Sequence, residues 1–421
     1  MFFNKYVIPF VVAFLLLYDV RPLIFGKVIN LPLIIVGMFF LKYAIVNCKK
    51  YRIEHLKIVI CLSLFTFLAI LQVLLQAPPN GDKGLTYFFI ELIVLFIGMA
   101  GIIDTYYERF KHGYIFLKMI ILIGCSQALI SLAMFLNNDI RSFIANNFLS
   151  DAIVFLQNNE MRGYGLSLAT TFTLTIIQSL ILFLIVYVLK DIGAKHVVYY
   201  ALAYTTIAIS VILAGRTGML GIGLSFIIIC LKSFIGNQRK NYRLFLGLVI
   251  IIILLVISVV SIFFSQNNQF VLWMQWAFEL VYSFGSTGKL STSSTNELLA
   301  MYQTLPDNPK TLLFGDGRLI GDTYNYWFET FSYYMNVDVG YLRLIFYFGI
   351  FMTFSFYGFY LFLIQKAFNY NRFSLCLAIT ISIYFLIIEM KGLFLININI
   401  NLLIFCFYLI SLKKKQNREC L

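Results

Sequence analysis

The chain has 421 residues, of which 61% are hydrophobic and only 12% are charged. A soluble domain cannot bury that much apolar surface, so the composition excludes a soluble protein and indicates that the bilayer is its solvent. The net charge of +13 does not indicate a nucleic-acid partner, because the basic residues cluster in short loops. Lysine and arginine in short loops are the usual signals of membrane topology.

The apolar runs are continuous and about 20 residues long, which predicts an all-α integral membrane protein and not a barrel. The first run lacks a small-residue cleavage site and continues into the second, so we interpret it as a retained helix. None of the seven cysteines falls in a predicted external loop, so no disulfide framework is expected. The sequence predicts about twelve spans, at roughly 5–24, 28–47, 57–77, 86–104, 114–136, 166–189, 197–214, 217–235, 244–264, 341–364, 373–390 and 393–411.

The basic residues distinguish the two sides of the predicted membrane. Every second loop lies on the same side of the membrane as the N-terminus, and these loops hold most of the basic residues. Because basic loops stay in the cytoplasm, both termini are predicted to be cytoplasmic. The chain then divides into nine helices over 1–264, one large external loop over 265–340, and three helices with a basic cytoplasmic tail over 341–421. The short external loops hold only seven basic residues: Arg21, Lys27, Lys83, Arg141, Arg162, Arg216 and Lys391.

The large loop is the one long segment too polar for lipid, and all three tryptophans lie in it. Trp273 and Trp276 stand three residues apart, which is typical of an interfacial helix. Trp327, between Tyr326 and Phe328, is a better candidate for stacking on a sugar ring. Interfacial anchoring is the comparable alternative for Trp327.

Four arginines at turns or span boundaries lie on the predicted outer face. Arg216 belongs to the short hairpin Ala214-Gly215-Arg216-Thr217-Gly218, where its planar guanidinium can bind two oxygens of a phosphate. Snorkelling to lipid headgroups is the alternative for Arg216. We expect Arg162, Arg318 and Arg343 to converge with Arg216 on an anionic ligand.

Asp338 lies just before a predicted span, five residues before Arg343. A carboxylate at the membrane edge is a candidate general base for a sugar hydroxyl, and a structural pair with Arg343 is the alternative. The other acids of the large loop are expected to be solvated: Glu279, Glu297, Asp307, Asp316, Asp322 and Glu329. Polar residues inside or at the ends of the predicted spans are expected to face the bundle interior and hold helices together, and lining a substrate path is the alternative: Asp19, Glu91, Glu389, Asn397, Asn399 and Asn401.

The histidines argue against a metal site on the outer face. His55, His112 and His196 all fall in predicted cytoplasmic loops, and the outer loops hold no cluster of histidine or cysteine. No nucleotide-binding glycine motif is present either. The sequence therefore predicts chemistry without a metal or a cofactor.

Three short motifs resemble those of bacterial O-antigen polymerases, the Wzy class, which are related to the O-antigen ligases and capsular polysaccharide polymerases. The motifs are Ala214 to Gly218, Leu313 to Gly317, and Asp338 to Arg343, and the Arg162-Gly163-Tyr164-Gly165 turn is also similar. The resemblance implies a GT-C-type membrane glycosyltransferase at the periplasmic face of the bacterial inner membrane. Its substrate would be undecaprenyl-diphosphate-linked oligosaccharide, with the growing chain transferred onto the incoming repeat unit.

The resemblance also implies roles for individual residues. Arg216, Arg318, Arg343 and Asp338 are the expected catalytic residues, and Arg162, Tyr341 and Trp327 are the expected substrate-binding residues. A chain-length regulator is a candidate protein partner. An O-antigen ligase is one alternative, but ligases typically use a histidine in the large loop and this loop has none. A lipid-linked oligosaccharide flippase is the other, but such transporters are usually built from repeats.

Overall fold

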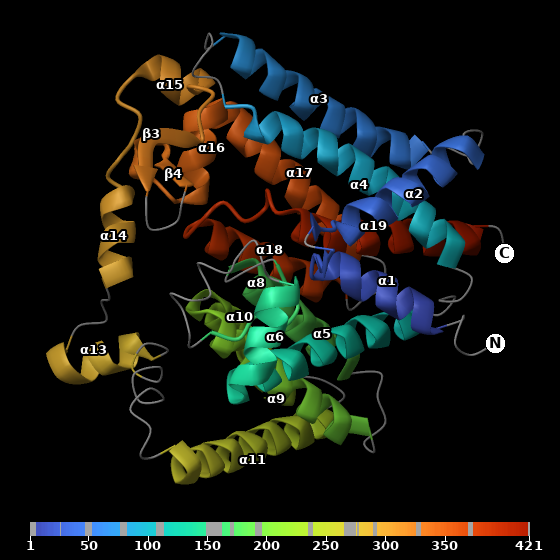
Figure 1. Ribbon diagram of the computed structural model, residues 1–421, viewed down its shortest axis with the longest axis vertical. Coiled ribbons are helices and arrows are strands. Elements are labelled where there is room, and N and C mark those ends of the chain that lie inside the picture. The colour runs from blue at the N-terminus through green and yellow to red at the C-terminus, as the bar shows by residue number, and fades with distance from the viewer. Residues whose placement is uncertain are drawn as a thin grey trace. The chain divides into compact units, whose positions relative to one another are not determined.

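The computed structural model is predominantly helical, with two short antiparallel hairpins among the residues that it describes (Figure 1). The described residues are 6–25, 27–46, 53–75, 82–106, 113–148, 162–168, 172–189, 196–234, 239–264, 275, 278–288, 293–325, 330–368 and 374–419.

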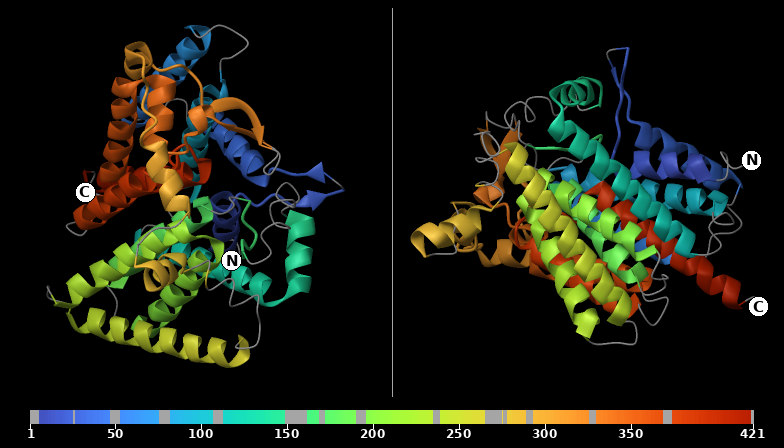
Figure 2. Two further views of the ribbon diagram at one scale, coloured as in Figure 1. Left: turned by 90° about the vertical axis from the view of Figure 1, so that its left-hand side faces the viewer. Right: turned by 90° about the horizontal axis from the view of Figure 1, so that it is seen from below.

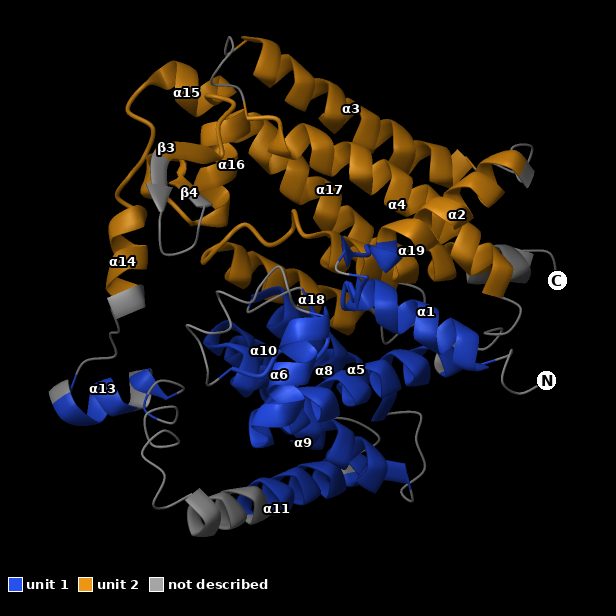
Figure 3. Cartoon of the chain, in the orientation of Figure 1, with its two compact units in different colours: residues 1–32, 108–291 blue, residues 33–107, 292–421 orange. Residues whose placement is uncertain are grey.

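The chain forms two compact units, each built from two separate stretches (Figure 3). Unit 1 comprises Met1–Pro32 and Glu108–Ser291, and unit 2 comprises Leu33–Tyr107 and Thr292–Leu421. Residues 265–340, the predicted external loop, are therefore divided between the units. The predicted division at 264 and 340 concerns position relative to the membrane, and it stays a prediction.

Unit 1 is organised around α8, which is buried along nearly its whole length. Helices α5, α9 and α10 pack against α8, and α11 packs against α9. The β1–β2 hairpin projects from the helices of its unit in both views of Figure 2, and Phe25 near its tip is fully exposed. The elements of unit 1 are α1 (Ile8–Leu17), β1 (Leu23–Ile24), β2 (Lys27–Val28), α5 (Gly113–Leu136), α6 (Asn138–Phe148), α8 (Phe172–Val188), α9 (Val197–Ala214), η7 (Arg216–Gly218), α10 (Met219–Phe234), α11 (Arg239–Phe264) and α13 (Glu279–Thr287).

Unit 2 has its core where α4, α17 and α19 meet, with α3 beside α4 and α18 beside α17. Aromatic rings fill this core, including the contact of Phe65 with Phe89 and Phe356. Its elements are α2 (Leu31–Val46), which begins at the unit boundary, α3 (Ile53–Leu75), α4 (Gly84–Tyr106), α14 (Ser293–Met301), α15 (Pro309–Phe314), β3 (Ile320–Asn325), β4 (Thr330–Tyr333), η8 (Tyr334–Asn336), α16 (Gly340–Phe348), α17 (Ile350–Phe368), α18 (Ser374–Glu389) and α19 (Ile398–Glu419).

The helices are those of a multi-pass membrane protein. Among the described residues, six are long and apolar enough to cross a bilayer, and five shorter ones are also apolar. Helix α3 leaves a row of large apolar side chains exposed, including Ile60, Leu64 and Phe67. Such exposure suits contact with lipid, because water would oppose it.

Several predicted spans differ from the observed helices; the span expected over 5–24, for example, is an α-helix only over Ile8–Leu17 and is followed by β1. Two of the differences have a clear physical cause. The single helix expected over 341–364 is two helices, α16 and α17, which are separated at Gly349. Gly349 has a φ of 77°, and a side chain there would collide with the carbonyl of Leu313. The helix expected from residue 393 begins at Ile398, because the Phe394 and Leu395 N–H groups bind the Glu389 carboxylate instead of helix carbonyls.

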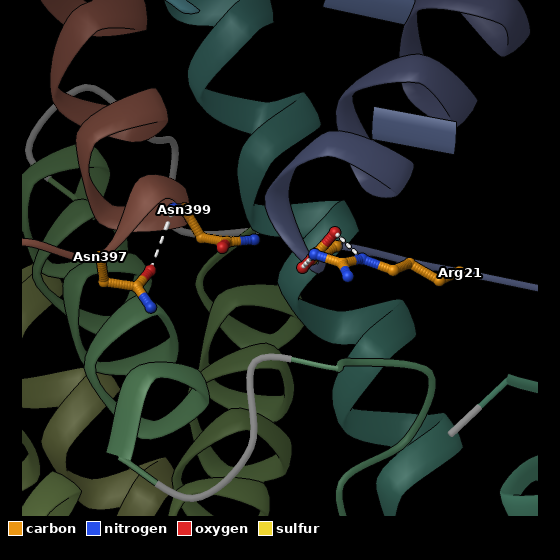
Figure 4. Close-up of polar contacts among 4 residues, drawn as sticks. Arg21, Asn397 and Asn399 are labelled. Atoms are coloured by element: carbon orange, nitrogen blue, oxygen red, sulfur yellow. Dashed lines mark hydrogen bonds and ion pairs between the residues drawn. The ribbon is translucent and has the colours of Figure 1, made fainter. Parts of the chain in front are cut away.

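Polar side chains within the predicted spans bind locally, as Figure 4 shows for two places. In unit 1, the Arg21 guanidinium donates to both carboxylate oxygens of Asp19, at 3.0 and 2.8 Å. In unit 2, the Asn399 N–H donates to Oδ1 of Asn397 at 3.0 Å. Both contacts join residues two positions apart, so they do not test the expectation that these residues hold helices together.

Candidate functional site

The turn before Arg318 is fixed by the backbone at the end of α16. Helix α15 starts at Pro309 with Asn308 as its cap, and Gly315 and Gly317 follow it with φ values of 75° and 66°. A side chain at Gly315 would collide with the Tyr347 carbonyl. The N–H groups of Asp316 and Gly317 donate to the carbonyls of Phe346 and Tyr347, at 2.5 and 3.1 Å. The motif from Leu313 to Gly317 therefore makes a close backbone contact that requires glycine.

Arg318 is held between an acid and an aromatic ring. Its Nη2 lies 2.5 Å from Oδ1 of Asp322, and its guanidinium carbon lies 5.2 Å from the centroid of Tyr334. The Tyr334 hydroxyl donates to Oδ2 of Asp316 at 3.2 Å, and Thr311 donates to Oδ1 of the same carboxylate at 2.8 Å. The expectation that Asp316 is merely solvated is wrong, because two hydroxyl groups donate to its carboxylate. Asp322 pairs with Arg318, but its side chain is 80% exposed and therefore solvated as expected.

Asp82 anchors the same turn, and sequence reasoning missed it. Its Oδ2 accepts a hydrogen bond from the Leu319 N–H at 3.1 Å, and its carbonyl accepts one from the Tyr347 hydroxyl at 3.0 Å. Its Oδ1 accepts a third from the Gly84 N–H at 2.7 Å, at the start of α4. The only signal in the sequence was an acid just before an apolar helix, which is also typical of an ordinary helix cap.

Asp338 and Arg343 form an ion pair at the start of α16. Arg343 Nη1 lies 3.4 Å from Oδ1 of Asp338, and its guanidinium carbon lies 4.2 Å from the centroid of Tyr333. The Arg343 side chain is 13% exposed and the Asp338 side chain is 34% exposed. Nε of Arg343 is buried and has no hydrogen-bond partner among the described residues. A guanidinium group with a free buried N–H can bind an anionic group.

The electrostatics of Asp338 favour a proton acceptor. Burial raises the pKa of Asp338 to about 6, and the positive charges of Arg343 and Lys391 oppose that rise. A purely structural ion pair would lower the pKa, because a neighbouring cation stabilises the carboxylate. Since burial outweighs both cations, Asp338 can accept a proton near neutral pH.

Tyr341 and Gly340 connect this pair to α18. The Tyr341 hydroxyl donates to the Leu386 carbonyl at 2.6 Å, and its ring packs on Tyr357 with centroids 4.8 Å apart. A Cβ added at Gly340 would lie 2.6 Å from Oε2 of Glu389. The described contacts of Tyr341 are thus internal, and its expected role in substrate binding stays a prediction.

In unit 1, Arg216 lies in the 3-10 turn between α9 and α10. Gly218 and Gly221 lie directly against Thr175 and Ser179 of α8, so the hairpin packs closely on that helix. Arg216 forms an ion pair with Glu279 of α13, and the two side chains are 27% and 33% exposed. Glu279 was expected to be solvated, and this contact shows that expectation to be wrong.

Arg162 begins a short segment that is bound to α5. The Gln127 side chain donates to the Tyr164 carbonyl at 2.7 Å and accepts from the Leu166 N–H at 3.3 Å. Burial raises the pKa of Tyr164 to about 12, and the charges of Arg162 and Arg141 act in the opposite direction. The positive charges of both arginines therefore act on the Tyr164 hydroxyl.

The candidate arginines are divided between the two units. Arg162 and Arg216 belong to unit 1, and Arg318 and Arg343 belong to unit 2. The two arginines of unit 2 lie over consecutive tyrosines, Tyr334 and Tyr333. Trp327, the third expected substrate-binding residue, lies outside the described residues, as do Trp273 and Trp276.

The parts of the chain that the structure describes contain no group of three or more histidines, cysteines or acids that could hold a metal ion. His55 was expected in a loop, but it lies in the first turn of α3, 4% exposed and 3.2 Å from the Tyr43 hydroxyl. Comparison of the chain with protein-family models, curated proteins and solved structures finds no match.

Proposed function

We propose that the protein polymerises undecaprenyl-diphosphate-linked oligosaccharide repeat units of O-antigen or capsule. It is then a GT-C-like glycosyltransferase with about twelve spans in the bacterial inner membrane. Its active site faces the periplasm, and it transfers the growing chain onto the incoming repeat unit. The resemblance of the motifs Ala214 to Gly218, Leu313 to Gly317 and Asp338 to Arg343 to those of the polymerase family supports this proposal.

The observation that carries the proposal is the pairing of Asp338 with Arg343. In the proposed reaction, a sugar hydroxyl of the incoming unit attacks the anomeric carbon of the growing chain. Asp338 accepts the hydroxyl proton, for which a pKa of about 6 is suitable. The bond from the anomeric carbon to the diphosphate oxygen breaks, and lipid diphosphate leaves.

Arginine stabilises the charge that develops on the leaving diphosphate, so this step needs no metal. In unit 2, Arg343 and Arg318 each lie over a tyrosine ring and pair with an acid. An anionic ligand can displace that acid or share the guanidinium group with it. The reaction uses two lipid-linked substrates, and the proposal assigns diphosphate binding to the arginines of both units. Trp327 and Tyr341 remain the proposed sugar-binding residues.

Deletion of the gene, followed by gel analysis of surface glycans, tests the proposal. If the protein is a polymerase, the deletion strain should carry a single repeat unit on its lipid core and should lack the ladder of longer glycans. Complementation with Asp338→Asn should leave the ladder absent. Asp322→Asn is the matched control, since it is also an acid paired with an arginine but is 80% exposed, and it should restore the ladder.

The two alternative functions give a different gel. Loss of all surface repeat units on deletion would indicate a flippase or a ligase. The absence of histidine from residues 265–340 argues against a ligase, and the single asymmetric insertion argues against a repeat-built transporter.

A further inference from the structure

Helix α5 of unit 1 carries an exposed apolar face. Leu122, Leu129 and Leu136 are spaced seven residues apart, so they lie on one side of the helix, and they are 58%, 59% and 67% exposed. Helix α5 is also among the described helices that are long and apolar enough to cross a bilayer. Leucines exposed in this way suit acyl chains, because water would oppose their exposure. The lipid-facing side of α5 therefore extends to its last residue, Leu136.

Helix α6 begins where that face ends. Only Asn137 separates the two helices, and its side chain accepts from the N–H groups of Asp139 and Ile140, at 2.8 and 3.2 Å. A chain that leaves a span and caps the next helix within one residue has no length in which to depart from the membrane. Helix α6 therefore starts at the boundary between hydrocarbon and headgroups.

Helix α6 has an apolar side and a polar side. Ile140 and Phe143 are exposed on the apolar side, at 37% and 61%, and Ile144 of the same side is buried. Ser142 lies about 160° from Ile140 around the helix axis, on the polar side. An amphipathic helix at a membrane boundary lies in the plane of the interface, with its apolar side towards the acyl chains.

The β1–β2 hairpin continues this surface, because β1 packs against α6. In the right-hand view of Figure 2, the hairpin points away from α1 and across the direction of that helix. Phe25, near its tip, is fully exposed, and Ile24 and Lys27 beside it are exposed as well. Phe25 also has a φ of 51°, a conformation in which turns favour asparagine or glycine over an aromatic residue.

Backbone hydrogen bonding limits how deep the hairpin can lie. Its strands, Leu23–Ile24 and Lys27–Val28, pair only with each other, so their outer edges present polar backbone groups. Such groups cannot be left in hydrocarbon. The hairpin backbone must therefore stay among hydrated headgroups, where the Lys27 ammonium can reach phosphate oxygens and the Phe25 ring can enter the acyl region.

We propose that the hairpin and α6 form an anchor on the membrane surface, and that its partner is the phospholipid bilayer. Phe25, Ile140 and Phe143 insert into the acyl boundary of one leaflet, and Lys27 lies at the level of the phosphates. The anchor uses only residues of unit 1, and it is independent of the reaction that the protein catalyses.

Photo-crosslinking from the full chain tests the anchor. Phe25→p-benzoylphenylalanine and Phe143→p-benzoylphenylalanine are reconstituted separately in liposomes of phosphatidylethanolamine and phosphatidylglycerol. After irradiation, mass spectrometry should find the peptide of each site with the mass of one phospholipid added. Ser142→p-benzoylphenylalanine is the matched control, since Ser142 is exposed on the other side of α6, and its lipid adducts should be about tenfold fewer.

Other results would overturn the anchor. Absence of lipid adducts at Phe25 or at Phe143 would show that this part of the surface faces water. Equal lipid labelling at Ser142 and Phe143 would show that the apolar side of α6 does not lie on the membrane. Crosslinks between two chains in the liposomes, or to a second protein on irradiation of intact cells, would replace lipid with a protein partner. All three variants change exposed side chains, so they should elute as the wild type does in gel filtration.

Discussion

Nη1 of Arg343 lies 3.4 Å from Oδ1 of Asp338, where the large loop ends and α16 begins. This separation is longer than a close charged hydrogen bond, and the pKa of Asp338 still rises to about 6. The cation therefore approaches the carboxylate without neutralising its basicity. The proposed reaction depends on this arrangement of an arginine beside a carboxylate that can accept a proton.

The pH dependence of polymerisation should report Asp338. The base must be deprotonated, so kcat/KM should rise about tenfold per pH unit below 6 and level off above it. Asp338→Asn should lower kcat/KM by about 100-fold or more at pH 7.5. Initial rates between pH 4.5 and 8 measure both effects. A wild-type profile that stays flat across pH 6 would remove Asp338 from the role of base.

Arg216 should not tolerate lysine. Arg216→Lys should lower polymerisation about tenfold or more, because a point charge does not replace a bidentate contact. Its pair with Glu279 is partly exposed, so that pair contributes at most about 1 kcal/mol to stability. Glu279→Gln should therefore leave both abundance and activity near the wild type.

Glycan ladders and membrane protein levels, measured together for these variants, separate the roles of Arg216. Full ladders from Arg216→Lys would indicate a snorkelling anchor. Equal losses in Arg216→Gln and Glu279→Gln would indicate that Arg216 serves only the ion pair.

Gly340 should not tolerate a methyl group. A Cβ there would lie 2.6 Å from Glu389 Oε2 and 2.7 Å from the Gly392 carbonyl, so Gly340→Ala should cost about 1–3 kcal/mol. Gly358→Ala is the control, because a Cβ at Gly358 in α17 meets nothing within 4 Å. It should be neutral or stabilising by up to about 1 kcal/mol. Thermal unfolding in one detergent compares the two, and equal melting temperatures would show that α16 and α18 do not pack this closely.

The predicted topology is testable with reporter fusions. Fusions at Lys50, Arg239 and Lys415 should report the cytoplasm, and a fusion near Asn308 should report the periplasm, because basic loops are retained inside. A cytoplasmic signal near Asn308 would invert the arrangement. It would also place Arg318 and Asp338 on the wrong side for a periplasmic substrate.

Local features of the fold followed from the sequence, and distant contacts did not. Apolar runs predicted most of the helices, and the spacing of Asp338 and Arg343 allowed their pairing, since five residues separate them. The break at Gly349 depends on the carbonyl of Leu313, and the late start of α19 depends on the Glu389 carboxylate. Arg216 pairs with Glu279, and the turn at Arg318 is bound by Asp82. Both partners lie far away in the chain. No periodicity or spacing in the sequence records such contacts.

Reconstitution tests the proposed function most directly. The purified full chain, in liposomes with undecaprenyl-diphosphate-linked repeat units, should produce a ladder of polymers in the presence of a chelator and without nucleotide. In the proposed reaction the donor is already activated, and arginine takes the place of a metal in stabilising the leaving diphosphate. Arg343→Ala should produce no ladder under the same conditions. Monomeric repeat units alone from the wild-type chain, or a ladder that needs a divalent ion, would contradict the proposed mechanism.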